Sequence, residues 1–118
     1  MATDSHDNNE TYREFDDAVN MAPKELEEWL ETEESRSVGQ GSDGGESVGH
    51  KSGRRIVEIK RTKKGNLSDD DYAHMRKVVG YVHRHMAQKP SSSIADSNWR
   101  YSLKNWGHDP CKDPGIDC

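Results

Sequence analysis

The residues best suited to chemistry are a run of cations in the middle of the chain, and the chemistry that they suit is phosphate binding. Seven basic residues and a single acidic one, Glu58, lie between positions 51 and 64. Clusters of Lys and Arg neutralise nucleic-acid phosphates, and the arginine fork matches two phosphate oxygens at once. The run therefore predicts a nucleic-acid-binding segment. The expected contact residues are Lys51, Ser52, Arg54, Arg55, Arg61, Lys63 and Lys64.

The position of two arginines strengthens this interpretation. Arg54 and Arg55 follow Ser52-Gly53 at an expected helix start, where exposed N–H groups and the positive end of the helix dipole attract phosphate. A second interpretation stays open, in which the cations form a solvated face that pairs with the glutamate-rich segment 25–34. The glycines before the run match no nucleotide-binding fingerprint in a strand-to-helix context.

The other residues with catalytic or metal-ligating potential form no recognisable site. Enzyme motifs such as G-x-S-x-G and H-E-x-x-H do not occur, so we expect no enzymatic activity and no catalytic residues. His108-Asp109 is the one candidate pair, and a turn after a helix explains it equally well. His83 and His85 would point to different faces of a helix, and His74 lies three turns from His85. We therefore expect neither a metal site nor a cofactor.

The two tryptophans near the C-terminus favour a structural role. Trp99, Leu103 and Trp106 have the i, i+4, i+7 spacing of one helix face, which is typical of an amphipathic helix that packs into a core. Each indole buries a large apolar area. The alternative is a base-stacking platform in which Tyr101 and Arg100 would be exposed beside each other. The spacing favours the core.

The strongest helix signal covers residues 67–89 and marks the central element of the fold. Ser68 is an N-cap, and Asp71 three residues later completes a capping-box pattern. Apolar residues then recur at helical spacing until Pro90 stops the helix. At 1.5 Å per residue it would be about 30 Å long, the diameter of a small domain.

Four shorter helices are expected around it. They cover residues 9–20, 23–34, 54–64 and 97–106, the last ending at Gly107. The 54–64 segment also fits a strand, but its neighbours are helical and no partner strand is visible. Residues 35–53 contain six of the ten glycines, which predicts a long flexible loop.

Composition indicates a small folded core between polar segments. A third of the 118 residues are charged and the mean hydropathy is −1.16, near the boundary of disorder. Residues 1–50 have a net charge of −11, and residues 51–104 have a net charge of +8. An acidic half beside a basic half suggests intramolecular pairing or a basic face kept for a polyanion. So small a core is marginally stable alone, which leaves a homodimer open.

Targeting signals are not visible in the sequence. No run of about 18 apolar residues could span a membrane, and the acidic N-terminus lacks the pattern of a signal peptide. Cys111 and Cys118 do not form a disulfide framework. We therefore expect a cytoplasmic protein with free thiols.

Three segments together resemble a known family of small proteins from bacteria, archaea and fungi. These segments read SGRRIVEIKRTKK, LSDDDYAHMRKVVGYVHRHMAQKP and NWRYSLKNWGHDP. They are similar to domain of unknown function 3140, and the resemblance extends over roughly residues 10–110. Members of that family are often labelled DNA-binding. The resemblance implies a family rather than an established activity, and it implies no catalytic residues. The family pattern usually has an apolar residue at the position of Lys60.

The expected architecture is an all-α bundle of about five helices around the central one. Residues 1–8 and 108–118 are expected to be tails, and residues 9–107 a single helical domain with the 35–53 loop. The expected function is non-enzymatic DNA binding or a nucleoid-associated accessory role. The alternative is a protein-interaction or stress-related module that binds no nucleic acid.

Overall fold

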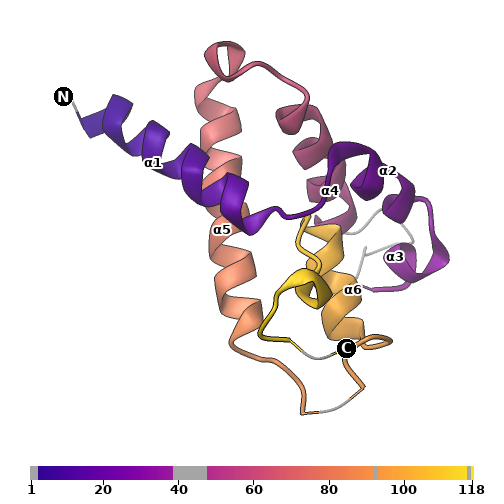
Figure 1. Ribbon diagram of the computed structural model, residues 1–118. Coiled ribbons are helices and arrows are strands. Elements are labelled where there is room, and N and C mark those ends of the chain that lie inside the picture. Colours follow the sequence, from indigo (N-terminus) through magenta and orange to yellow (C-terminus); the bar gives the residue numbers. More distant parts are fainter. Residues whose placement is uncertain (1–2, 39–47, 92, 117) are drawn as a thin grey trace.

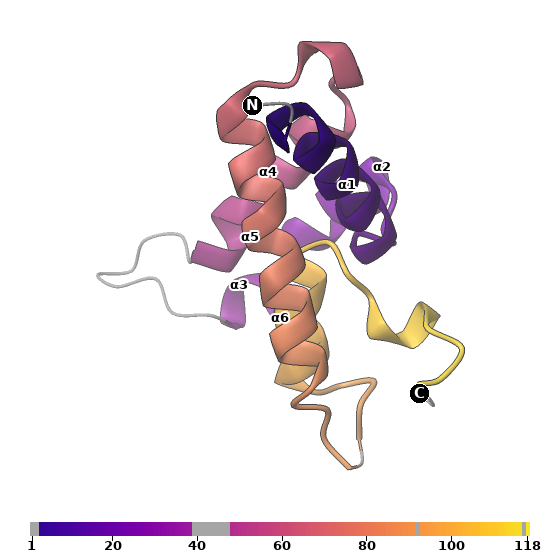
Figure 2. The same ribbon diagram turned by 90° about the vertical axis from the view of Figure 1, so that its left-hand side faces the viewer.

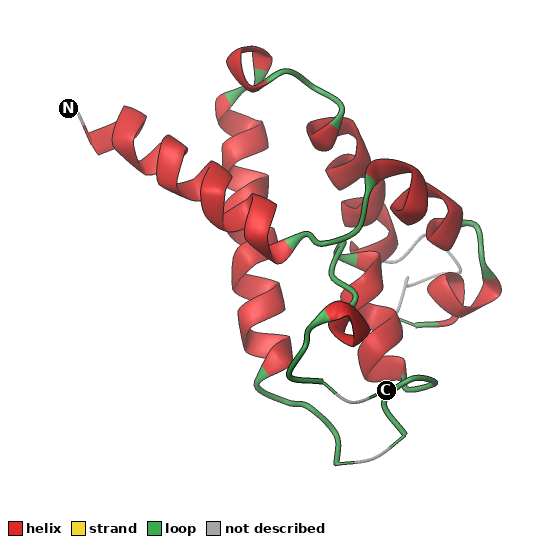
Figure 3. Cartoon of the chain, in the orientation of Figure 1, coloured by secondary structure: helices red, strands yellow, loops and turns green. Residues whose placement is uncertain are grey.

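The computed structural model describes residues 3–38, 48–91, 93–116 and 118, and these form helices, turns and loops without a strand (Figure 3). The all-α class and the number of helices agree with the prediction. The elements are α1 (Thr3–Ala18), α2 (Pro23–Leu30), α3 (Glu33–Ser37), α4 (Val48–Lys60), the 3₁₀ turn η2 (Lys64–Asn66), α5 (Asp69–Met86), α6 (Asn98–Asn105) and the 3₁₀ turn η3 (Pro110–Lys112).

Helix α5, the longest, runs along most of the height of the molecule and contacts α1, α4 and α6 (Figure 1). Helix α1 crosses α5 near its middle, and α4 runs beside the upper half of α5 (Figures 1 and 2). On the other side of α4, α2 and α3 form the outer edge of the fold. Helix α6 contacts α2, α3, α4 and α5, so it closes the bundle.

Local sequence signals determine where α5 begins. The Ser68 Oγ accepts a hydrogen bond from the Asp71 N–H (3.1 Å), and the Asp71 carboxylate accepts one from the Ser68 N–H (3.0 Å). This is the predicted capping box. The helix ends at Met86, slightly before the predicted end at 89. The buried residues of α5 are Tyr72, Met75, Val78, Val79 and Val82.

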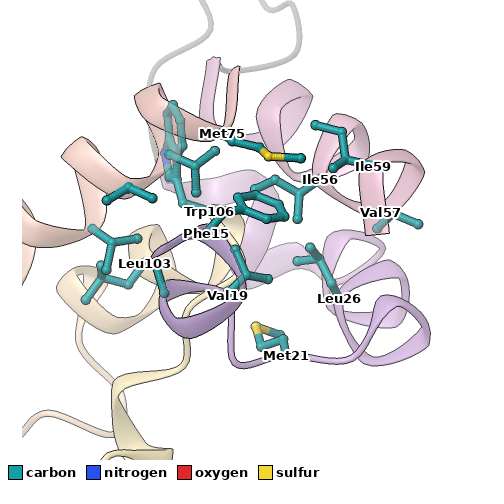
Figure 4. Close-up of a cluster of buried hydrophobic side chains, with 14 of the residues drawn as sticks. Phe15, Val19, Met21, Leu26, Ile56, Val57, Ile59, Met75, Leu103 and Trp106 are labelled. Atoms are coloured by element: carbon teal, nitrogen blue, oxygen red, sulfur yellow. The ribbon is translucent and has the colours of Figure 1, made fainter. Parts of the chain in front are cut away.

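Apolar side chains from five helices meet in one core (Figure 4). Phe15 of α1, Leu26 of α2, Ile56 of α4 and Met75 of α5 converge there with Leu103 of α6. The tryptophans of α6 belong to the same core, because Trp99 is only 9% exposed and Trp106 only 5%. The core interpretation of the tryptophan pair is therefore confirmed.

A small buried polar network joins α2, α3 and α6. Asn105 Oδ1 accepts hydrogen bonds from the Trp29 indole N–H (2.8 Å) and from the Ser35 hydroxyl. The Asn105 amide donates in turn to the Ser35 carbonyl (3.0 Å). Asn105 is 1% exposed, so these bonds replace the water that its amide has lost. Gly107 follows with φ of +83°, the left-handed residue predicted to end the helix.

The basic segment is a helix, but its predicted bounds of 54–64 are wrong. Helix α4 begins at Val48 and ends at Lys60. Ser52 and Gly53 were interpreted as the end of a flexible loop, yet both are buried in α4 one turn before Ile56. Close packing outweighs the low helix propensity of glycine here.

The predicted flexible loop 35–53 is also shorter than expected in the part that the structure describes. Helix α3 occupies its start and α4 its last six residues, while residues 39–47 lie outside the described ranges. At the N-terminus, α1 begins at Thr3, so the predicted disordered tail 1–8 is mostly helical.

The C-terminal segment from His108 is packed rather than extended. The His108 ring bonds through Nδ1 to the Ala18 carbonyl (2.7 Å), and the Asp109 N–H donates to Asn20 (2.7 Å). Both Asp109 oxygens accept hydrogen bonds from Arg100, at 3.0 and 3.1 Å. These partners lie far away in sequence or on another element, which is why local composition missed the segment.

One smaller expectation is also corrected. The cysteines are not free, because Cys111 and Cys118 form a disulfide with a Cα–Cα distance of 5.7 Å. Lys60 at the end of α4 places its ammonium 3.4 Å from the Asp16 carboxylate and 3.5 Å from the Val19 carbonyl oxygen. Its aliphatic stem covers the core edge while its charge stays at the surface.

Among the described helices, none has the length and apolar character needed to cross a bilayer.

Candidate functional site

The seven residues predicted to bind nucleic acid do not form one patch. They lie in three places around α4 and the turn that follows it. Lys51, Ser52 and Arg55 face α5, whereas Arg54 and Arg61 line a cavity toward α2. Lys63 and Lys64 lie after the end of α4, at the opposite end of that helix from Lys51.

The group that faces α5 lines a small basic cavity, named here the Lys51 pocket, of about 330 Å³. Its lining residues are Lys51, Ser52, Arg55, His74, Lys77 and Trp106. Lysine and arginine are the only charged side chains among them. Lys51 and Lys77 are exposed, and the indole of Trp106 is buried. The pocket is therefore lined by two exposed lysines and by a buried aromatic ring.

Hydrogen bonds between α4 and α5 hold this pocket in shape. The Ser52 hydroxyl and His74 Nε2 lie 2.8 Å apart, and Arg55 Nη2 donates to Asp71 Oδ1 over 3.0 Å. Burial lowers the pKa of His74, and the nearby charges of Arg55 and Lys77 lower it further. The His74 ring is therefore neutral at pH 7. Hydrogen bonds from Ser68 and Arg55 lower the pKa of Asp71, so that carboxylate stays ionised.

The cations on the other side of α4 have acidic neighbours. Arg61 makes two hydrogen bonds to the Glu27 carboxylate, at 3.1 and 3.2 Å. Arg61 and Arg54 line a cavity of about 670 Å³ together with Glu27 and Glu58. For Arg61, the alternative interpretation of pairing with the glutamate-rich helix is therefore confirmed.

The two lysines after α4 are separate again. Lys63 and Lys64 are exposed, and the Lys64 ammonium lies 5.0 Å from the centre of the Tyr12 ring of α1. Tyr12 thus holds Lys64 on the α1 side of the bundle through a cation–π contact. These lysines do not extend the Lys51 pocket.

Helix α5 supplies cations that the sequence prediction missed. Arg76, Lys77 and Arg84 are exposed on it, and Lys77 and Arg84 are seven residues apart, which puts them on one face. The guanidinium of Arg84 lies back over Gly80, 3.1 Å from where a Cβ would stand. A signal was available, because residues 72–95 contain no acidic residue at all. We define the basic face as Lys51, Arg55, Arg76, Lys77 and Arg84.

Stacked aromatic rings join α5, which carries three cations of the basic face, to α6. The Trp106 and Tyr81 rings lie 4.3 Å apart and within 14° of parallel, and His85 stacks on the other side of Tyr81 at 5.0 Å. His74 and Trp99 continue this series at its two ends. The series couples α5 to α6, so the cations of α5 project from a fixed helix.

The half-buried histidines His74 and His85 predict a pH-dependent stability. Burial lowers the pKa of His85 as it does that of His74, whereas the unfolded chain takes up protons near the usual histidine pKa of about 6.5. The stability that the neutral rings contribute is therefore complete above that pH, and it falls as the pH drops below it. Thermal unfolding followed by circular dichroism from pH 8 to 5 should show this fall.

Two variants test whether His85 is responsible for the loss of stability at low pH. His85→Phe keeps a ring in the stack and removes the titrating group, so we expect a shallower fall in melting temperature below pH 6.5. His83→Gln changes an exposed side chain on the same helix and should leave the fall unchanged. Equal pH profiles for His85→Phe and the unmodified protein would contradict this account.

His108 and Asp109, the one candidate catalytic pair, are both engaged in packing. The Nδ1 atom of His108 bonds to a backbone carbonyl, and Asp109 is held by Arg100 and the Cys111 N–H. Burial alone would raise the pKa of Asp109, but those hydrogen bonds bring it below the usual value. The pair therefore fastens the C-terminal segment. The described residues contain no group of three potential metal ligands.

Comparison with known proteins gives a family but no activity. No curated protein and no solved structure matches the chain. The family model described as protein of unknown function (DUF3140) matches residues 14–104. That range covers most of the chain and includes α2, α3, α4, α5, all of α6 except Asn105, and every residue of the basic face. The chain belongs to the DUF3140 family of proteins of unknown function.

Proposed function

We propose that this domain is a non-enzymatic DNA-binding protein that contacts the phosphates of duplex DNA through the basic face. One observation carries the proposal: Lys51, Arg55 and Lys77, from the neighbouring helices α4 and α5, border a pocket that no carboxylate lines, and Arg76 and Arg84 are exposed on the same α5. Cations in such an arrangement neutralise phosphates and release their counterions. Lysine and arginine contact phosphates whatever the base sequence, so the proposed binding is to the backbone and has no predicted sequence specificity.

The distribution of charge across the fold supports this orientation. Helices α2 and α3 hold five glutamates against two cations, Lys24 and Arg36. They lie at the right of the molecule in Figure 1, with α4 and α6 between them and most of α5. A polyanion is repelled by the acidic edge and attracted by the basic face. The net charge of −5 is therefore compatible with DNA binding on one side.

The alternative function, a protein-interaction module, has its own supporting observation. Arg61 and Lys112 pair with Glu27 and Glu25 of α2, so some of the cations are already neutralised within the fold. An acidic edge of this kind would suit a basic protein partner. Either function leaves the fold the same, and only binding experiments separate them.

Fluorescence anisotropy with a labelled 20-base-pair duplex at low and at physiological salt tests the proposal. Lys77→Gln combined with Arg84→Gln should weaken binding on the order of tenfold or more, because two phosphate contacts are lost. The matched control is Arg61→Gln combined with Lys112→Gln, which removes the same charge from cations paired with α2. The control should bind nearly as well as the unmodified protein.

Two outcomes would contradict the proposal. One is no binding by the unmodified protein at low salt. The other is equal weakening by both double variants, which would mean that net charge alone governs association. Circular dichroism of each variant checks that the fold is kept.

A further inference from the structure

The Lys51 pocket differs from the rest of the basic face because it is hollow. Arg76 and Arg84 lie on the exposed surface of α5, whereas Lys51, Arg55 and Lys77 surround a cavity of about 330 Å³. The phosphodiester backbone of a duplex that lies along the protein contacts cations on the exposed surface. A hollow of this size accepts a small group that projects from the end of a chain.

Charge favours a doubly charged occupant. A phosphodiester carries one negative charge, whereas a terminal phosphate carries nearly two at pH 7 and has three acceptor oxygens. Three cations border the pocket, and one of them, Arg55, is also held by Asp71 at 3.0 Å. Arg55 remains 40% exposed, so part of its guanidinium stays available. The remaining two lysines match the charge of a dianion.

The walls of the pocket are already arranged for a ligand. Ser52 and His74 are linked at 2.8 Å across α4 and α5, and the His74 ring stacks on Trp106, 12° from parallel. Little of the wall must be reordered on binding, which lowers the entropic cost. Ser52 was predicted as a direct contact, but it is 3% exposed and acts through His74 as part of the wall.

The other cavity lacks these properties. The cavity between α2 and α4 is larger, about 670 Å³, but it is lined by both signs of charge, including Glu27, Glu31 and Glu58. An anion placed there would face three carboxylates. The Lys51 pocket is therefore the better candidate for an anion.

We propose that the Lys51 pocket binds a phosphate monoester, specifically the terminal 5′-phosphate of a nucleic-acid strand. This inference rests on the proposed function, since the basic face positions the strand whose end enters the pocket. It adds a preference for strand ends to a surface that otherwise binds any duplex.

The test compares two labelled duplexes of the same sequence, one with 5′-phosphates and one with 5′-hydroxyls. We expect the phosphorylated duplex to bind about tenfold more tightly, as charge-assisted hydrogen bonds to one additional charge would give. Lys51→Gln should bring this ratio close to one. Arg76→Gln, outside the pocket, should weaken both duplexes equally and keep the ratio.

A competition arm separates a strand end from a free ligand. A nucleoside 5′-monophosphate should displace the phosphorylated duplex only at millimolar concentration, because it lacks the contacts to the rest of the basic face. Displacement at micromolar concentration would overturn the strand-end assignment in favour of a small phosphorylated ligand.

The failure of this inference and the failure of the proposed function give different results. Equal, salt-sensitive binding of the two duplexes would overturn the pocket assignment and leave DNA binding intact. No binding of either duplex would remove the proposed function itself, and the strand-end inference with it.

Discussion

Gly53→Ala is expected to lower the free energy of unfolding by about 2–3 kcal/mol, the cost of overpacking a core. A Cβ at this position would stand 2.5 Å from the Asn105 carbonyl oxygen and 2.7 Å from Leu30 Cδ2. Neither neighbour can move easily, because one is backbone and the other is fully packed in α2. The gain in helix propensity, about 1 kcal/mol, offsets only part of the clash.

Urea denaturation followed by circular dichroism measures this effect, and Gly65→Ala is its control. No heavy atom lies within 4 Å of the position where a Cβ at Gly65 would stand, so this variant should change stability by less than about 0.5 kcal/mol. If Gly53→Ala were as stable as Gly65→Ala, the close approach of α4 to α6 would be wrong.

Asn105→Ala is expected to cost about 3–4 kcal/mol, more than Gly53→Ala. It leaves the Trp29 indole N–H and the Ser35 hydroxyl without their shared acceptor, and it removes the donor to the Ser35 carbonyl. Each buried polar group left unpaired costs about 1–3 kcal/mol. The variant also removes the side-chain hydrogen bonds that link Asn105 of α6 to α2 and α3.

The same denaturation experiment applies, with Asn66→Ala as the matched control. Asn66 is exposed in η2, so its amide keeps its hydration in both states. A loss below 1 kcal/mol for Asn105→Ala would show that water or other donors replace the network. Trp29 fluorescence offers a second readout, since its indole N–H would lose its partner.

The parts of the fold that were predictable from sequence have local causes. The capping box of Ser68 and Asp71 and the left-handed Gly107 involve neighbours in the chain, so both could be identified. The Trp99, Leu103 and Trp106 spacing predicted a buried face for the same reason. These local signals are sufficient to predict helices α5 and α6 from the sequence.

What the sequence did not predict depends on contacts between distant segments. Gly53 was assigned to a loop because its local sequence is glycine-rich. The packing against Leu30 and the Asn105 backbone that stabilises its helix involves residues distant in the sequence. The C-terminal segment was assigned as a tail because Arg100, the ion-pair partner that holds Asp109, lies on another element. In both cases the partner, not the residue, determines the structure.

The candidate site was predicted only in part for a similar reason. The cation run identified Lys51 and Arg55, but which cations share a surface depends on how α4 sits between α2 and α5. That packing directs Arg61 to Glu27 and brings Lys77 beside the pocket. A one-dimensional charge count cannot separate these faces of a helix.

The salt dependence of DNA binding tests the central claim most directly. The logarithm of the association constant should fall linearly with the logarithm of salt concentration, with a slope of about −0.9 for each phosphate contact. For the five cations of the basic face, we expect a slope of about −4.5. Lys77→Gln with Arg84→Gln should make it shallower by about 2, whereas Arg61→Gln with Lys112→Gln should leave it unchanged. A slope that is the same in all three proteins would contradict phosphate binding through this face.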